Sequence, residues 1–210
     1  MNKSRAIKTL FVDIGGVLLT NGWDHLARHA AAKKFRLNWA EMEERHRLNF
    51  DTFEQGKLTL EEYLKRVVFH RPRRFTRAQF RRFMLAQSKA FPEMISLVRQ
   101  LKARHGLKVI VVSNEGRELN AHRIHTFKLA EFVDAFVSSC FVQLRKPDEE
   151  IFRLALDLAQ TPASAIVYLE NTPLFVDVAA GLGIRGIVHA DYRRTRDELA
   201  ALGLDCAAEP

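Results

Sequence analysis

Four runs of apolar, β-favouring residues in this chain are each followed by a polar side chain that could do chemistry. In chain order they are Asp13 after TLFV, Ser113 with Asn114 after VIVV, Lys146 in the loop following FVSS, and Glu170 with Asn171 after IVYL. A carboxylate can attack phosphorus, and a hydroxyl and an ammonium group can neutralise phosphoryl oxygens. Carboxylate and amide oxygens can hold magnesium. The set suits phosphoryl transfer, provided that the fold brings its members together.

Asp13 poses the question most sharply, because a buried carboxylate is costly unless it is paired, hydrogen-bonded or bound to a cation. The stretch TLFVDIGGVLLT turns through Gly15 and Gly16 directly after it. Asp and Gly are also ordinary turn residues, so this stretch alone leaves a plain turn and a catalytic carboxylate equally open. The surrounding elements must decide between them.

Strand-like and helix-like periodicity alternate along most of the chain. Strands are predicted within residues 8–13, 106–114, 132–139, 165–171 and 184–190, and helices within 92–106, 116–130, 146–160, 174–183 and 195–203. This order predicts an α/β fold, a Rossmann-like parallel sheet with flanking helices. Ligands of such sheets bind beyond the carboxyl ends of the strands, which is where the polar residues fall.

Residues 17 to 90 interrupt this alternation. The segments WDHLARHAAAKKF, AEMEERHRLNFDTF and TLEEYLKRVVF have helical patterns and predict a small α-helical bundle beside the sheet. The expected organisation is therefore an α/β core domain of residues 1–16 and 91–210, with residues 17–90 inserted as a helical cap.

The motifs FVDIGGVL, VVSNEG, RKPDEEIF and YLENTPLFVDVAAGLG, in this order, resemble the haloacid dehalogenase-like (HAD) hydrolase superfamily over nearly the whole chain. The resemblance is to the phosphatase-like branch with a helical cap after the first motif. It implies that Asp13 is the nucleophile and forms an aspartyl-phosphate, with Ser113 and Lys146 as the catalytic pair that holds the phosphate. Gly16 and Asn114, together with Lys146, would contact the substrate.

The same resemblance implies a Mg²⁺ cofactor held by Asp13, the backbone carbonyl of Gly15, Glu170 and Asn171. Most family members carry an aspartate at the position of Asn171. An amide oxygen can ligate magnesium but brings no charge, so the sequence predicts weaker metal binding here.

A second departure from the family lies at Gly15, where most phosphatases of the superfamily have an aspartate that acts as general acid and base. Loss of such a group typically costs about 10² to 10⁴ in rate, or roughly 3 to 5 kcal/mol. Either the leaving group needs little protonation, as in sugar 1-phosphates or acyl phosphates, or a nearby side chain substitutes. Asp24 and His25 are the candidates for that substitution.

The sequence therefore predicts a Mg²⁺-dependent phosphohydrolase that acts on a small phosphorylated metabolite, with a sugar phosphate as one candidate. The alternative is a catalytically weak or inactive relative that binds a phosphorylated ligand or a protein partner and regulates. The dehalogenase branch fits less well, because its D-x-Y-G-T motif has a tyrosine that this chain lacks.

Composition and sequence pattern indicate where the protein is expected to be found and whether it associates with membranes. The hydrophobic fraction is 47%, and no apolar run approaches the roughly 20 residues that span a bilayer, so no membrane association is expected. The start of the chain lacks the cleavage region of a signal peptide, which predicts a cytoplasmic protein. Cys140 and Cys206 have no metal-ligand spacing and are expected to be free thiols. Nothing indicates an oligomeric state.

The net charge of +8 is partly local, because RPRRFTRAQFRRF (residues 71–83) holds six arginines and no acid. On a helix, Arg74, Arg77 and Arg81 would share one face while Phe80 and Phe83 point elsewhere. A solvated face over a packed aromatic one is the favoured interpretation, followed by an anion-attracting rim of a phosphate site. Nucleic acid ranks last and is not expected as a partner, because no nucleic-acid-binding module accompanies the run.

Two further patterns resemble known sites but lack the required context. GLGIRG (residues 181–186) matches a dinucleotide fingerprint in letters, yet a helix is predicted before it and a strand after it, the reverse of what that site needs. The pairs His25/His29 and His122/His125 are spaced for one helix face but have no third ligand, so they are interpreted as surface or satisfied histidines.

Overall fold

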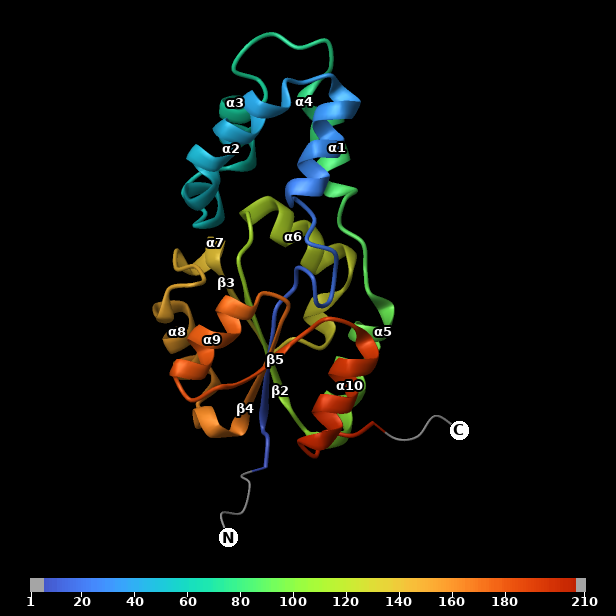
Figure 1. The fold of residues 1–210 in the computed structure, drawn as a ribbon, viewed down its shortest axis with the longest axis vertical. Helices are drawn as coiled ribbons and strands as arrows, with labels where there is room; N and C mark the ends of the chain where they lie inside the picture. The colour runs from blue at the N-terminus through green and yellow to red at the C-terminus, as the bar shows by residue number, and fades with distance from the viewer. Residues whose placement is uncertain (1–5, 207–210) are drawn as a thin grey trace.

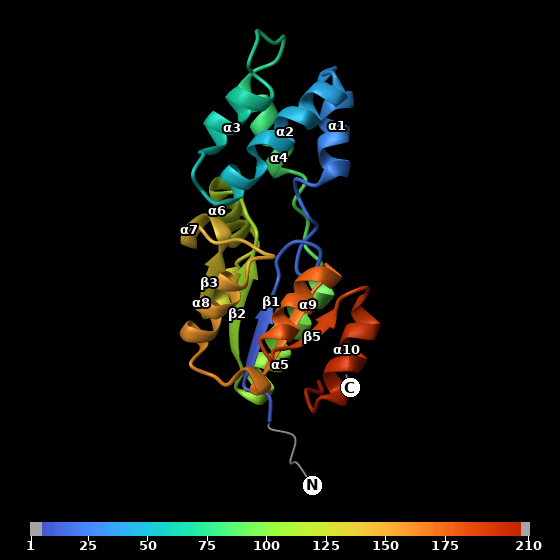
Figure 2. The same ribbon diagram turned by 60° about the vertical axis from the view of Figure 1, so that its left-hand side comes forward.

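The computed structural model describes residues 6–206, which form a five-stranded sheet between helices, with a second layer of helices beyond one end of the sheet (Figure 1; Figure 2). The strands are β1 (Thr9–Val12), β2 (Lys108–Ser113), β3 (Ala135–Ser138), β4 (Ile166–Glu170) and β5 (Arg185–Val188). Their order is β3-β2-β1-β4-β5, and all four pairings are parallel. The residues that follow these strands therefore meet at one edge of the sheet.

Helices cover both faces of the sheet. They are α5 (Pro92–His105), α6 (Arg117–Thr126), α7 (Ser139–Val142), α8 (Glu149–Ala159), α9 (Pro173–Gly181) and α10 (Tyr192–Ala201), with 3₁₀ turns at Leu129–Glu131 and Ala163–Ala165. Side chains alternate along β1: Leu10 and Val12 pack in one cluster with α5 and α10, and Phe11 packs in another with α8 and α9. Burial on both faces accounts for the continuous apolar runs in the strand sequences.

The second layer is made of α1 (His25–Phe35), α2 (Trp39–Glu54), α3 (Leu60–Val67) and α4 (Arg77–Leu85). We call it the cap. It has its own apolar cluster, in which Tyr63, Phe80 and Met84 are fully buried. Capping boxes begin α3 at Thr59 and α4 at Thr76, so the ends of both helices are fixed by local sequence.

Two neighbouring linkers join the cap to the sheet domain. They are bonded to each other, since the backbone N–H of Thr20 donates to the carbonyl of Lys89 (2.9 Å). Arg123 of α6 binds both linkers, with its Nη2 2.9 Å from the Thr20 carbonyl and its Nε 3.0 Å from Ser88 Oγ. The two chain connections between cap and core therefore run side by side, and Arg123 of the core binds both.

These features confirm the predicted α/β fold with its parallel sheet and flanking helices. The division at residues 17 and 90 stays a prediction, and the terminal segments 1–5 and 207–210 of the predicted core lie outside the described residues. Between residues 6 and 206, no helix is long and apolar enough to cross a membrane. Cys140 and Cys206 are free, as predicted.

One helix prediction is wrong. Arg74 does not share a helix face with Arg77 and Arg81, because α4 begins only at Arg77, after the N-cap Thr76. The capping box formed by Thr76 and Gln79 sets this start. Phe80 is buried in the cap, in agreement with the favoured interpretation of a solvated face over a packed aromatic one.

Candidate active site

Asp13 lies at the carboxyl end of the central strand. Its backbone N–H still pairs with the sheet, donating to the Leu169 carbonyl (2.9 Å), while its side chain enters the space above the strand ends. The loop that follows is tight, because the N–H of Gly16 donates to the Leu19 carbonyl (2.7 Å). The residue is only 7% exposed, so its carboxylate needs a positively charged partner.

Lys146 is that partner. Its Nζ lies 3.1 Å from Asp13 Oδ1 and 2.5 Å from Glu170 Oε2, and it donates to the Tyr168 hydroxyl (3.0 Å). The Tyr168 hydroxyl in turn donates to Glu170 Oε2 (2.5 Å). The structure therefore brings together three of the residues predicted from sequence, in a buried cluster around one ammonium group.

The charges in this cluster oppose the cost of burial. Burial alone lowers the pKa of Lys146, but Asp13 and Glu170 outweigh it, and the pKa is raised. The pKa of Asp13 is raised to about 7, mainly by burial. Lys146 opposes this rise, Glu170 adds to it, and the hydrogen bond from the Ser113 hydroxyl opposes it. Lys146 stays protonated at neutral pH, as a group that neutralises phosphoryl oxygens must be.

Two predicted substrate-binding residues have structural partners of their own. The side-chain amide of Asn114 donates to the Lys146 carbonyl and accepts from its N–H, both at 2.9 Å, so Asn114 positions Lys146. The N–H of Gly16 is used within its loop, and a Cβ at this residue (φ +75°) would lie 2.4 Å from Asn171 Nδ2. Only glycine fits there. Direct contacts of Asn114 and Gly16 with substrate stay predictions.

Ser113 ends β2 beside Asp13 and is 1% exposed. Its hydroxyl lies 3.3 Å from Glu115 Oε1, and it does not line the cavity described below. A role for Ser113 in holding phosphate stays a prediction.

Three oxygen-bearing groups converge where the resemblance implies a metal. The end of the Asn171 amide lies 2.9 Å from Glu170 Oε1 and 3.1 Å from the Gly15 carbonyl. With its nitrogen turned toward them, the amide donates to both oxygens; with its oxygen turned, three oxygens face one point. Adjacent ligands of octahedral magnesium lie about 3.0 Å apart, given bonds of about 2.1 Å. The spacing and the chemistry of these donors fit Mg²⁺.

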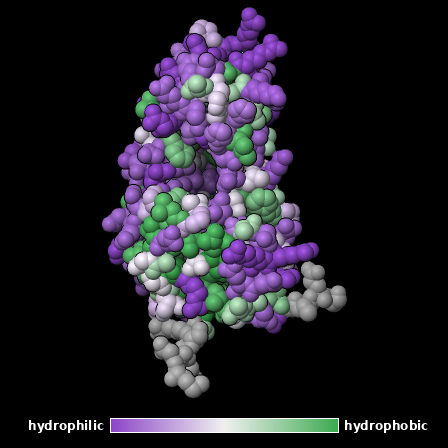
Figure 3. Space-filling model, viewed as in Figure 1, coloured by the Kyte–Doolittle hydropathy of each residue, from purple (hydrophilic) through white to green (hydrophobic). Residues whose placement is uncertain are grey.

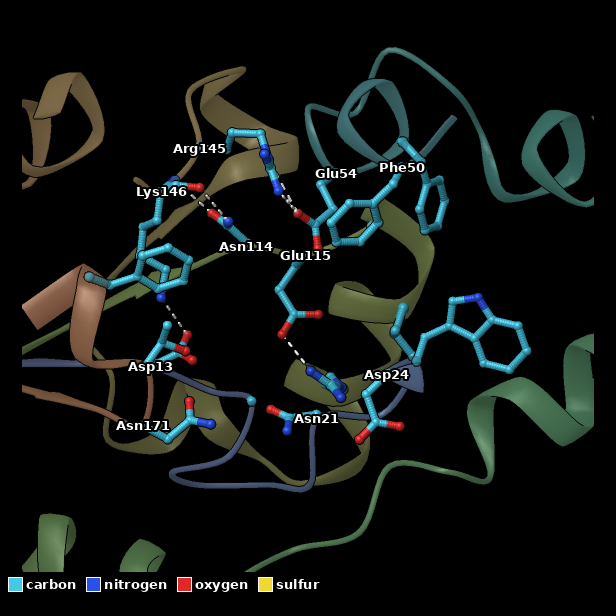
Figure 4. A pocket seen from close by; sticks show the side chains of 18 of the residues that line it. Asp13, Asn21, Asp24, Phe50, Glu54, Asn114, Glu115, Arg145, Lys146 and Asn171 are labelled. Carbon is cyan, nitrogen blue, oxygen red and sulfur yellow. Dashed lines mark hydrogen bonds and ion pairs between the residues drawn. The ribbon is translucent and has the colours of Figure 1, made fainter. Parts of the chain in front are cut away.

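A cavity of about 260 Å³ opens beside Asp13, between the cap and the sheet domain. The molecular surface is hollowed at this level (Figure 3). The walls of the cavity combine polar groups of the sheet edge with aromatic and apolar side chains from the cap and the core. The aromatic and apolar side chains are Trp23, Phe50, Phe53, Leu119 and Phe175. Asp13, Lys146 and Asn171 form the floor of the cavity (Figure 4), and Gly15 also lines it.

The structure adds two ion pairs that the sequence analysis missed. Arg145 Nη2 lies 2.8 Å from Glu54 Oε2 and so joins the core to α2 of the cap. Arg123 Nη1 lies 2.5 Å from Glu115 Oε1, with both side chains 2% exposed. All four residues line the cavity. Glu115 and Arg145 adjoin predicted site residues in sequence, but nothing in the sequence singles out Glu54 among the many carboxylates of the cap.

The two candidates for a substitute acid differ in position. Asp24 lines the cavity, but its Oδ1 caps α1 by accepting from the N–H of Ala27 (2.8 Å). His25 is exposed and packs edge-on against Trp39, with ring centroids 5.0 Å apart, and is not among the lining residues. The structure thus brings only Asp24 of this pair to the site.

The other patterns set aside in the sequence lie away from the cavity. None of the arginines of residues 71–83 lines it, so the interpretation as an anion-attracting rim is wrong. In the GLGIRG stretch, α9 ends at Gly181 and β5 begins at Arg185, the reverse of a dinucleotide site. Within residues 6–206, no group of three or more His, Cys, Asp or Glu side chains could hold a metal.

The fold and the site together define the class: a Rossmann-like parallel α/β protein with an aspartate, a buried lysine and an oxygen cluster at the carboxyl edge of its sheet, beneath a helical cap. The family model for haloacid dehalogenase-like hydrolases matches residues 7–183. The chain belongs to this family.

Solved structures share the fold. A HAD-family enzyme of Bacteroides thetaiotaomicron matches with a TM-score of 0.76 at 21% identity, over 91% of this chain and 98% of that chain. Its complex with magnesium and inorganic phosphate matches with a TM-score of 0.74 at 21% identity, over 90% and 99% of the two chains. The L-2-haloacid dehalogenase of Xanthobacter autotrophicus matches at 0.61 and 13% identity, over 93% and 83%. At such identities the likeness shows the fold alone.

Among curated proteins, the acyl-CoA dehydrogenase family member 10 of Mus musculus is 31% identical over 100 residues. The match covers 48% of this chain and 9% of that protein. The chain thus spans only a small part of that much longer relative.

Proposed function

We propose that this protein is a Mg²⁺-dependent phosphohydrolase that removes phosphate from a small phosphorylated metabolite through an aspartyl-phosphate on Asp13. The observation that carries the proposal is the position of Asp13, whose carboxylate borders the cavity 3.1 Å from the buried ammonium group of Lys146. A nucleophile beside a fixed positive charge is what displacement at phosphorus requires.

Asp13, the Gly15 carbonyl, Glu170 and Asn171 would hold the Mg²⁺ ion. When bound, the ion neutralises charge on the nucleophile and the phosphoryl oxygens. The complex of the similar HAD-family enzyme with magnesium and inorganic phosphate supports Mg²⁺ as the metal. The amide of Asn171 contributes no charge, so we expect this chain to bind the ion more weakly than a homologue with an aspartate there would.

Three residues of the chain have separate roles in the proposed reaction. Asp13 attacks phosphorus, and Lys146 neutralises the developing charge from its fixed position. Asn114 holds the backbone of Lys146 through two hydrogen bonds, which limits the reorganisation needed during reaction. Water then attacks the phosphoryl group of the aspartyl-phosphate and frees Asp13.

The cavity limits the substrate. Its volume of about 260 Å³ lies just below the usual range for small-molecule sites, about 300 to 1,000 Å³, and favours a small substrate. Aromatic side chains such as Phe50 and Phe175 line it beside the charged floor. We therefore favour a small phosphate ester whose organic part has an apolar face, such as a sugar phosphate.

A regulatory protein that binds a phosphorylated ligand without turning it over is the second candidate. It is favoured by Gly15, where a Cβ would lie 3.2 Å from Asn21 Oδ1, so that an amide occupies the space of the usual acid. An amide cannot donate and regain a proton as a carboxyl group does.

Phosphate release from a panel of phosphomonoesters, with and without Mg²⁺, tests the choice. We expect turnover of at least one small ester that requires both Mg²⁺ and Asp13, with Asp13→Asn as the inactive comparison. A folded protein that binds phosphorylated ligands but releases no phosphate from any of them would favour the regulatory candidate.

A further inference from the structure

The site lacks the general acid that most phosphatases of the superfamily carry at the position of Gly15. Esters with poor leaving groups need such an acid, so a side chain outside the loop that follows Asp13 has to supply the proton. Besides Asp13, three carboxylates line the cavity: Asp24, Glu54 and Glu115. Asp24 caps α1, and Glu115 is 2% exposed and held by Arg123. Of the three, Glu54 is the one placed to face a substrate.

Glu54 is the last residue of α2, and it is held against the core at two points. Ser139 Oγ donates to its backbone carbonyl (2.6 Å), and Arg145 donates from Nη2 (2.8 Å) and Nε (3.3 Å) to Oε2. Both contacts of Arg145 fall on Oε2, which leaves Oε1 for another group. Figure 4 shows the side chain of Glu54 pointing from the cap toward the cavity, across from Asp13.

This placement matches the geometry of displacement at phosphorus. The attacking and leaving oxygens lie roughly in line, so the leaving oxygen is on the side of phosphorus opposite Asp13. We propose that Glu54 is the general acid and base of the reaction, supplied by the cap in place of the side chain that Gly15 lacks. This inference rests on the proposed phosphohydrolase function.

The surroundings of Glu54 favour a carboxyl group that can exchange a proton near neutral pH. The pKa of Glu54 is raised to about 7, because burial outweighs the lowering effect of the ion pair with Arg145. Glu115 of the loop after β2 adds to the rise, and Lys146 opposes it. Asp51, one turn earlier on α2, shares Arg145 at 3.0 Å. A catalytic acid works best when its pKa lies near the operating pH.

The two steps balance with this assignment. In the first, an Asp13 oxygen forms a bond to phosphorus, the bond from phosphorus to the ester oxygen breaks, and the Glu54 proton passes to that oxygen to give the alcohol. In the second, Glu54 takes a proton from water as the water oxygen bonds to phosphorus. The bond to Asp13 breaks, phosphate leaves, and both side chains return to their starting states.

Esters that differ in leaving group test the proposal. An alkyl phosphate needs a protonated leaving group, whereas 4-nitrophenyl phosphate does not. We expect Glu54→Gln to lower kcat/KM for a small alkyl phosphate by about 10² to 10⁴, and for 4-nitrophenyl phosphate by less than about tenfold. The variant should also release one equivalent of nitrophenol rapidly and then accumulate the aspartyl-phosphate. Glu44→Gln is the matched control, because it removes an exposed carboxylate from the same helix, away from the cavity, and should behave as wild type.

The outcomes separate the two hypotheses. If Glu54→Gln affects both esters equally, or neither, the role of Glu54 is overturned while the phosphohydrolase function stands. If the wild type shows no turnover that depends on Asp13, the proposed function fails and this role with it. Should Glu54→Gln not fold, Arg145→Gln provides a second test, because loss of the guanidinium raises the pKa of Glu54. The high-pH fall in kcat/KM for the alkyl ester must then move to higher pH, and an unmoved limb contradicts the proposal.

Discussion

The ammonium group of Lys146 lies between two carboxylates, 3.1 Å from Asp13 and 2.5 Å from Glu170. Lys146 and Glu170 are each 1% exposed, so Glu170 cannot exchange this partner for bulk water. The lysine therefore has a structural role besides the proposed catalytic one. Its loss leaves two like charges close together in a site of low polarity.

We expect Lys146→Met to lower the free energy of unfolding by about 3 to 5 kcal/mol, measured by urea denaturation without metal. Lys102→Met is the control, since Lys102 forms a more exposed ion pair with Asp134 and should cost about 1 kcal/mol or less. Equal losses in the two variants would show that the buried cluster carries no special stability.

The hydroxyl of Tyr168 is the neutral group in the buried cluster around Lys146, and its removal shows how much it contributes to the stability of the fold. Its hydroxyl bonds both Lys146 and Glu170, and Tyr168→Phe removes it while keeping the ring packing. We expect a loss of about 1 to 3 kcal/mol in unfolding free energy, because two buried polar groups lose a partner. An unchanged denaturation midpoint would contradict the assigned bonds.

Metal affinity can be measured without turnover. Asn171→Asp adds a charged ligand beside Glu170 and Gly15, and we expect it to raise Mg²⁺ affinity roughly tenfold or more in a calorimetric titration. Asn49→Asp on α2 controls for the change in net charge. Wild-type affinity in Asn171→Asp would show that this side chain does not face the ion.

His46 gives the cap a pH-dependent stability. Trp23 Nε1 donates to the Tyr63 hydroxyl (2.9 Å), and the same hydroxyl forms a hydrogen bond with His46 Nδ1 (2.7 Å). Burial, with Arg28 adding to it, lowers the pKa of His46 to about 4. The unfolded chain, with an ordinary histidine pKa, binds this proton below about pH 6.5. Stability is therefore fully present above that pH and is lost as the pH falls toward 4.

The loss attributable to His46 is about 3 kcal/mol between pH 6.5 and 4. We expect His46→Gln to abolish that part of the pH dependence in urea denaturation, while His29→Gln on the exposed face of α1 leaves it unchanged. The same slope in wild type and His46→Gln would mean that His46 is protonated in the folded cap.

Sequence reasoning placed the sheet, the cap helices and the meeting of Asp13 with Lys146, because strand periodicity and parallel topology dictate which residues share an edge. It could not find Glu54, since helical spacing does not tell which of several carboxylates in the cap turns toward the core. A contact of Asn114 with substrate stays a prediction, and the structure adds that its amide holds the backbone of Lys146, a contact that depends on a loop distant in sequence. The start of α4 was readable from the capping pair Thr76 and Gln79.

The most direct test of the account is the covalent intermediate. Wild-type protein should be mixed with Mg²⁺ and a substrate found in the ester panel, and the reaction should be quenched in acid within the first turnover. The protein is then digested, and the masses of its peptides are measured by mass spectrometry. We expect one phosphoryl group on the peptide that contains Asp13, absent without Mg²⁺ and absent in Asp13→Asn. Phosphate release by the wild type with no phosphoryl group trapped on that peptide, even in Glu54→Gln, would contradict the assignment of Asp13 as the nucleophile.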